Sequence, residues 1–358
     1  KERKKERKKE RKKERRNKMK KIFLTLLVFL TFFTSNSVIA NSISQKDQNT
    51  YEFVDSVGRK VIIPKNISKI VPSGTNAQLV LAGFSPEKMV GIAKKPSKET
   101  LNTIKNFPID KPEIGQYYGK NPNFNKEELI KVNPQVIIDI GEKKKTIKDD
   151  MEQISENTGL PIIFIELTPE TAPQAYRTLG KVLNKEKLGE EIANFLEEKN
   201  TIIKNTLKTI PDNEKLTFIQ VGNNALNVDP SNSSHTEAIE FAGGINKAPS
   251  KEKGAKSKTE NLNMEEVMSW DPDVIFAKDK NSYDIITTSP AWSSFRAVKN
   301  GKVYLIPQTP YNWVTSPPSA NKMMGIYWAA KTLYPKYFTC DLKEIETKFN
   351  KLIYGIGR

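Results

Sequence analysis

Short apolar runs and helical patterns alternate along most of the chain. Six runs are rich in Ile, Val, Leu and Phe, as the buried strands of parallel sheets are. They lie at residues 68–71, 136–140, 162–166, 216–221, 274–277 and 303–306. Segments with apolar residues three and four positions apart separate them and predict helices. This alternation predicts an α/β fold with parallel sheets and right-handed crossovers.

One helical pattern is longer than the others. Within residues 186–208, apolar side chains recur at helical spacing with Glu and Lys between them, namely Leu188, Ile192, Phe195, Leu196, Ile202, Ile203 and Leu207. A helix of this length measures about 34 Å. We expect it to join two Rossmann-like lobes that face each other across a ligand cleft and hinge little. The alternative is an ordinary surface helix of the first lobe.

Two distant segments resemble each other. Residues 124–139 and 262–277 are identical at six of sixteen aligned positions, with an offset of 138. In each copy an Asn can cap a helix start, and glutamates follow it at the positive end of the helix. A proline, Pro134 or Pro272, then ends the helix and starts an apolar strand. We interpret the repeat as two similar lobes related by duplication. The alternative is a common α/β motif that occurs twice without common descent.

The first forty residues differ in composition from the rest. Residues 1–18 repeat Lys, Glu and Arg without an apolar side chain, which predicts a disordered basic leader, with a basic arm for membrane or nucleic acid as the alternative. Residues 19–40 have a basic head, about a dozen apolar residues and the compact triplet that ends at Ala40. This is the pattern of a cleavable secretory signal, and its apolar run is short for a membrane span.

Charge and cysteine content narrow the class of protein. Residues 1–40 carry 15 Lys/Arg and 4 Glu, so +11 of the net charge of +16 lies there and +5 remains for the other 318 residues. The high pI is therefore no evidence for nucleic-acid binding. Cys340 lies far from the signal junction, so we expect a free periplasmic protein without a lipid anchor. A chain of 318 residues favours two lobes, at residues 41–185 and 210–358, joined by residues 186–209.

Five segments in a fixed order carry a family resemblance. They are residues 55–64, 69–76, 81–84, 242–246 and 292–304. Over residues 51–354 the chain resembles the helical-backbone class of ABC-importer binding proteins. That class captures ferric siderophores, haem, cobalamin and, in some branches, molybdate or free metals. The resemblance implies a binding protein with no catalytic residues and no cofactor.

The resemblance also implies a partner. In this class a glutamate at the head of each repeated helix docks onto arginines of the permease dimer, and the matching positions here are Glu127 and Glu265. Two separated carboxylates set orientation and encounter rate more than affinity. Helix-start electrostatics, shared by Glu128 and Glu266, is the alternative explanation. We expect a monomer that meets the membrane only through the permease.

The candidate ligand residues lie in loops that follow the strands, because ligands bind beyond the carboxyl ends of open α/β sheets. These loops are residues 73–76, 116–120, 141–145, 222–227 and 308–315. Aromatic faces bury large ligand area, and amides and hydroxyls fix its orientation, although each ring can equally pack its own loop. The candidates are Thr75, Asn76, Tyr117, Tyr118, Asn224, Tyr311 and Trp313.

His235 is the candidate metal ligand. It follows three serines and an asparagine near a predicted helix start, where its imidazole can complete the coordination of an incompletely wrapped metal chelate. A solvent-facing turn histidine is the alternative. One His disfavours a receptor for bare Zn²⁺ or Mn²⁺, which requires several such ligands. We therefore expect the ligand to be a metal chelate, and specifically a ferric siderophore.

An oxyanion, haem or cobalamin ligand is the alternative within the same fold. Ser316 or Ser319 can cap the helix that follows, and such a helix start binds anions such as molybdate, although capping alone explains the serines. An enzyme and a surface adhesin are the alternatives from other functional classes. No G-x-S-x-G elbow, phosphate loop or paired His motif occurs in the sequence.

Overall fold

The computed structural model describes residues 49–118, 122–250, 260–315 and 317–357. Residues 52–358 belong to one compact unit. The leader and signal predictions for residues 1–40 lie outside the described residues.

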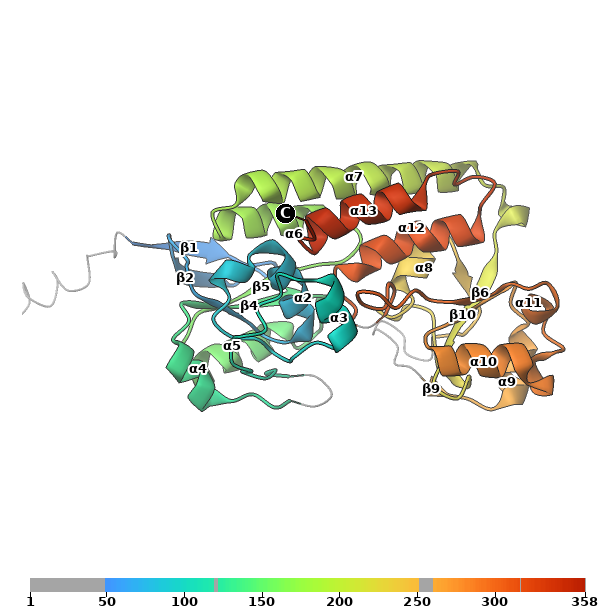
Figure 1. The fold of residues 1–358 in the computed structure, drawn as a ribbon, viewed down its shortest axis with the longest axis horizontal. Coiled ribbons are helices and arrows are strands. Elements are labelled where there is room, and N and C mark those ends of the chain that lie inside the picture. Colours follow the sequence, from blue (N-terminus) through green and yellow to red (C-terminus); the bar gives the residue numbers. More distant parts are fainter. Residues whose placement is uncertain (1–48, 119–121, 251–259, 316, 358) are drawn as a thin grey trace, which may run out of the picture. The chain divides into compact units, whose positions relative to one another are not determined.

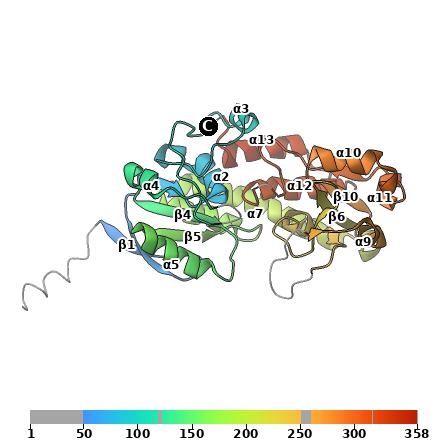
Figure 2. The same ribbon diagram turned by 90° about the horizontal axis from the view of Figure 1, so that it is seen from below.

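The N-terminal lobe is built on a parallel sheet of order β3-β4-β5 (Figure 1). Its strands are buried on both faces because α2 and α5 cover opposite sides of the sheet (Figure 2). The elements of this lobe are β1 (Thr50–Val54), β2 (Lys60–Pro64), β3 (Ile70–Pro72), α2 (Thr75–Phe84), α3 (Lys98–Thr103), α4 (Lys126–Val132), β4 (Val136–Gly141), α5 (Ile147–Thr158), β5 (Ile162–Glu166) and α6 (Ala172–Val182). β1 and β2 form a two-stranded sheet, and the Asp55 side chain accepts hydrogen bonds from the backbone of the turn between them.

The C-terminal lobe has a mixed six-stranded sheet. β11, β10, β6 and β8 run parallel, whereas β7 and β9 are antiparallel to their neighbours, so the all-parallel prediction is wrong for this edge. The polar β6–β7 hairpin causes the difference, since two of its turn residues, Asn223 and Ala225, adopt positive φ. The elements are β6 (Thr217–Gly222), β7 (Asn227–Asp229), α8 (Glu237–Phe241), β8 (Ile245–Asn246), β9 (Glu260–Asn261), α9 (Met264–Trp270), β10 (Val274–Ala277), α10 (Lys280–Thr288), α11 (Arg296–Lys299), β11 (Val303–Leu305) and α12 (Asn321–Leu333). The last helix, α13 (Leu342–Ile353), packs on α12, on the helix at residues 186–209 and on α2 of the N-terminal lobe.

Helix α7 (Glu186–Thr209) joins the two lobes and is about 36 Å long. Near its start Gly189 lies against α6, so close that a Cβ there would meet the Tyr176 carbonyl oxygen at 2.5 Å. Near its end Leu207 lies against Gly243 of the C-terminal lobe. α7 also contacts α12 and α13 (Figure 1). The two-lobe fold with one connecting helix is therefore confirmed.

The sequence repeat is a structural repeat. Asn125 accepts hydrogen bonds from the backbone of α4, and Asn263 does the same for α9. Each helix has seven residues and ends at a left-handed residue, Asn133 with φ 45° or Asp271 with φ 35°. Each then leads into a buried parallel strand, β4 or β10.

Candidate ligand site at the lobe junction

The loops beyond the N-terminal sheet form one side of the candidate site. β3, β4 and β5 are parallel and in register, so their carboxyl ends share one edge. Residues 73–74 lead from this edge into α2, and residues 142–146 lead into α5. This edge is where open α/β sheets place ligands.

A buried carboxyl group, Asp139, lies on β4 next to this edge and is 3 % exposed. The Ser73 hydroxyl donates a hydrogen bond to its Oδ1. Burial raises the pKa of Asp139, and hydrogen bonds from Ser73 and Tyr118 together with the charge of Lys144 lower it only in part. Burial and the Asp139 charge in turn raise the pKa of Tyr118, and Lys144 Nζ lies 4.7 Å from the centre of that ring. Tyr118 is thus held by its own lobe beside the sheet edge.

Replacing Asp139 with asparagine should change how stability depends on pH. When the pKa of a carboxyl is higher in the folded protein than its unfolded value of about 3.9, the free energy of unfolding falls as pH rises from the unfolded to the folded pKa. The asparagine variant lacks this loss, so its free energy of unfolding should improve relative to wild type as pH rises from about 4 to 7. Urea denaturation across that range measures the trend, with the exposed Asp149→Asn as control. A difference that stays constant or shrinks contradicts it.

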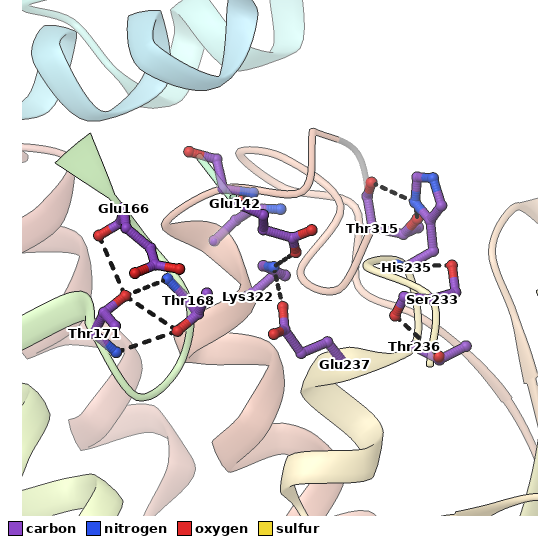
Figure 3. A network of polar contacts seen from close by, with 12 residues as sticks. Glu142, Glu166, Thr168, Thr171, Ser233, His235, Thr236, Glu237, Thr315 and Lys322 are labelled. Carbon is purple, nitrogen blue, oxygen red and sulfur yellow. Dashed lines mark hydrogen bonds and ion pairs between the residues drawn. The ribbon is translucent and has the colours of Figure 1, made fainter. Parts of the chain in front are cut away.

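A buried lysine connects the two lobes (Figure 3). Lys322, at the start of α12, has no exposed side-chain area. Its Nζ lies 2.8 Å from Glu142 of the N-terminal lobe and donates a second hydrogen bond to Glu237 at the start of α8. Paired carboxylates are what allow a lysine to stay charged at such burial. This triad, Glu142–Lys322–Glu237, is the best-defined polar cluster at the junction.

The triad perturbs the proton affinity of its own members. Burial raises the pKa of Glu237; Lys322 opposes the rise, and the nearby Glu142 adds to it. Burial alone would lower the pKa of Lys322, but Glu237 and Glu142 raise it above its ordinary value. The cluster therefore favours a charged lysine, and Glu237 takes up a proton more readily than a free glutamate does.

His235 lies in the segment before α8, and its Nδ1 faces Thr315 (Figure 3). Nδ1 is 3.2 Å from the Thr315 carbonyl oxygen and also contacts the Thr315 hydroxyl. A proton on Nδ1 donated to that carbonyl leaves the Nε2 lone pair available as an acceptor or a metal ligand. Among the described residues, no group of three His, Cys, Asp or Glu side chains is arranged to hold a metal ion.

Direct hydrogen bonds join the lobes around the triad. Ser319 Oγ donates to the Asn76 carbonyl oxygen at 2.9 Å, linking the stretch before α12 to α2. On α3, Thr100 Oγ1 donates to the Pro310 carbonyl oxygen at 2.8 Å. The expected site loops 73–76 and 308–315 are therefore both at the junction.

The expected cap of α12 is wrong for Ser319, and Ser316 lies outside the described residues. The helix begins at Asn321 with Ala320 as its N-cap, which makes no side-chain capping bond. The Ser319 hydroxyl donates instead to the Asn76 carbonyl oxygen, while the Asn321 side-chain oxygen accepts a hydrogen bond from the Ser319 backbone N–H.

The other predicted aromatic residues pack within the protein. Tyr117 stacks on Phe124 with ring centres 4.0 Å apart. Tyr311 packs beside Tyr354, and burial raises the pKa of Tyr311 to about 12. Trp313 is 8 % exposed, and its Nε1 donates to the Thr309 carbonyl oxygen at 2.8 Å.

The two remaining ligand candidates lie in different settings. Thr75 is the first residue of α2 and is half-buried at the junction. Asn224 is exposed in the β6–β7 turn, where its side chain accepts from the Leu226 backbone. The structure thus brings Asn76 close to Ser319 and His235 close to Thr315, while Asn224 stabilises its own turn.

The candidate docking residues Glu127 and Glu265 are both exposed in the first turn of their helices. Neither forms an ion pair with a described residue, whereas the adjacent Glu128 pairs with Lys131 at 2.6 Å. The carboxylates at 127 and 265 are therefore presented to solvent in equivalent positions of the repeat.

The sequence did not single out Glu142, Glu237 or Lys322. The one available signal was a lysine directly before the apolar stretch at residues 323–330. None of the helices in the described ranges is both long and apolar enough to cross a membrane.

Comparisons with known proteins point to one family. A family model described as "Periplasmic binding protein" matches residues 70–310. The molybdate-binding protein MolA of Haemophilus influenzae is 23 % identical over 327 residues, which cover 84 % of this chain and 90 % of MolA. The Fe(3+)-citrate-binding protein YfmC of Bacillus subtilis is 27 % identical over 227 residues, covering 62 % of this chain and 67 % of YfmC.

Solved structures share the fold. An ABC transporter solute binding protein from Sulfurospirillum deleyianum superposes with a TM-score of 0.78 at 22 % identity, covering 86 % of this chain and 95 % of that one. MolA bound to molybdate superposes with a TM-score of 0.65 at 20 % identity, covering 85 % of this chain and 98 % of that one.

Proposed function

Because this chain belongs to the periplasmic binding protein family, we propose that it is the solute-binding component of an ABC importer. It captures a small ligand between its lobes and delivers it to the permease. The observation that carries this role is the junction itself, where loops of both lobes meet around Lys322. Its role is binding rather than catalysis, and the periplasmic proteins it resembles favour export through a cleaved signal.

An anionic metal chelate, such as a ferric siderophore, is the ligand we propose. Three consecutive lysines, Lys143 to Lys145, follow Glu142 on an exposed loop of the junction. A positive rim of this kind attracts anions and speeds their encounter. A chelate also offers the apolar area and oxygen acceptors that suit half-buried tyrosines, amides and hydroxyls.

We propose that Asn76 and His235 contact this ligand. Both lie where the lobes meet, and His235 Nε2 can fill an open coordination position on a chelated metal while Nδ1 stays on Thr315. Tyr118 contributes its ring from the N-terminal lobe.

Calorimetry across ligand classes tests the proposal. A ferric catecholate or ferric citrate should bind with a Kd below about 1 µM, or more than about 8 kcal/mol, and free Fe³⁺, Zn²⁺ and Mn²⁺ should bind far more weakly. His235→Ala should weaken binding about tenfold if it ligates the metal. Tight binding of a free metal ion, with weak binding of every chelate, overturns the ligand class while leaving the importer role in place.

An oxyanion is the second candidate ligand. Lys322 lies in the first turn of α12, and a helix start with a lysine attracts anions. A molybdate ion there has to displace Glu142 or Glu237 from Lys322. Sub-micromolar molybdate binding in the same calorimetric series, lost in Lys322→Met, supports this alternative.

A further inference from the structure

The two repeated helices share an exposed apolar residue as well as an exposed acid. Ile130 on α4 is 66 % exposed, and Met268 on α9 is 44 % exposed. They are 138 residues apart and so occupy the same position of the repeat. Only seven large apolar side chains in the described residues are exposed, and these are two of them.

A single exposed apolar side chain is common on protein surfaces and needs no explanation. Two at the same position of a repeat are less expected by chance. The residues directly before them in the two helices, Leu129 and Val267, are both buried, as core packing requires. The capping geometry is also the same in both helices. The repeat therefore keeps a solvent-exposed apolar residue at the same position of both helices, next to a buried one.

The exposed apolar residue shares a helix face with the docking candidate. Ile130 follows Glu127 by three residues, and Met268 follows Glu265 by three residues, a spacing that places side chains side by side on a helix. Each lobe thus presents the same small surface, one carboxylate beside one apolar side chain. We define the acid–apolar pairs as Glu127 with Ile130 and Glu265 with Met268.

We propose that both acid–apolar pairs dock on the permease dimer, with Ile130 and Met268 as the residues that hold the complex together. This inference rests on the proposed importer function. A single chain that carries the same surface twice matches a partner with two equivalent faces, as a two-fold dimer has. The carboxylates steer encounter and orientation, and the apolar side chains, desolvated in the complex, slow dissociation.

Binding of the full exported chain to its permease dimer in lipid nanodiscs tests this proposal. Ile130→Ser with Met268→Ser should raise the Kd about 100-fold, mostly through faster dissociation, and the loss should persist at about 0.5 M salt. Glu127→Gln with Glu265→Gln should slow association at low salt and differ little from wild type at high salt. Ile202→Ser on α7, where Ile202 is 47 % exposed, is the matched control and should change neither rate.

Each outcome separates this inference from the function on which it rests. Normal binding by the Ile130/Met268 variant, with loss in the Glu127/Glu265 variant, overturns the apolar contact and leaves docking in place. Normal binding by both variants removes the docking surface altogether. If only one of the single substitutions, Ile130→Ser or Met268→Ser, weakens permease binding, the two-site arrangement is overturned. Self-association of the wild-type chain that disappears in the Ile130/Met268 variant shows that the occupant is a second copy, and also overturns the proposal.

Discussion

Replacing Lys322 with methionine should lower the free energy of unfolding by about 3 kcal/mol or more. Removing one partner of a buried ion pair leaves the other charge unpaired, which typically costs about 3–5 kcal/mol. Here two carboxylates, Glu142 and Glu237, lose their cation at once. Urea denaturation at pH 7, followed by circular dichroism, measures the loss.

The pH dependence of that loss identifies its cause. Without Lys322, burial and the neighbouring Glu142 hold the folded pKa of Glu237 above its unfolded value of about 4.3, so the variant should regain stability as pH falls toward that value. Adding Glu142→Gln and Glu237→Gln should restore most of the stability at pH 7. Lys336→Met, at an exposed pair with Glu214, is the control and should stay within about 0.5 kcal/mol of wild type. A Lys322→Met variant as stable as wild type at pH 7 contradicts the buried triad.

Removing both exposed acids, Glu127→Ala with Glu265→Ala, should reduce ligand uptake by cells more than about tenfold. The two carboxylates lie on helix heads away from the lobe junction and pair with no described residue, so ligand affinity should stay within about twofold. Uptake of a radiolabelled ferric chelate and calorimetric affinity of the purified variant measure the two effects separately.

The neighbouring acids provide a matched control that tests whether the exact helix position of the carboxylate matters. Glu128→Ala with Glu266→Ala removes the same charge one residue along each helix, from side chains that are half-buried. Uptake should then fall much less. Equal loss in both double variants points to general helix-start electrostatics, and loss of ligand affinity shows that the ligand face was assigned incorrectly.

Most of the fold could be predicted because its strands are buried on both faces. Such strands read as mostly apolar runs, and the six predicted runs match β3, β4, β5, β6, β10 and β11 within two residues at either end. The repeat of Asn caps and prolines likewise predicted α4 and α9. The antiparallel strand β7 was missed because its sequence, Asn227–Asp229, has one apolar residue between two polar ones and because its pairing depends on a turn with positive φ.

The candidate site was predictable only in part. Strand-end loops indicated the position of Asn76 and of the 308–315 loop because topology fixes which edge carries them. The triad was not predictable because Lys322 lies 180 residues from Glu142 and 85 from Glu237, so its partners depend on how the lobes pack. Trp313 shows the converse difficulty. An aromatic residue in a loop suggests a ligand-binding surface, yet the Trp313 indole packs in its own loop and donates to the Thr309 carbonyl oxygen.

The most direct test of the central proposal is native mass spectrometry of the protein purified from the exported fraction of its own cells. We expect the protein to carry the added mass of one iron chelate, with an iron isotope pattern that disappears when the sample is denatured. The ligand-free protein should regain the same increment when ferric chelates are supplied. An increment of molybdate or of a bare metal ion, or failure to take up any ferric chelate, contradicts the account.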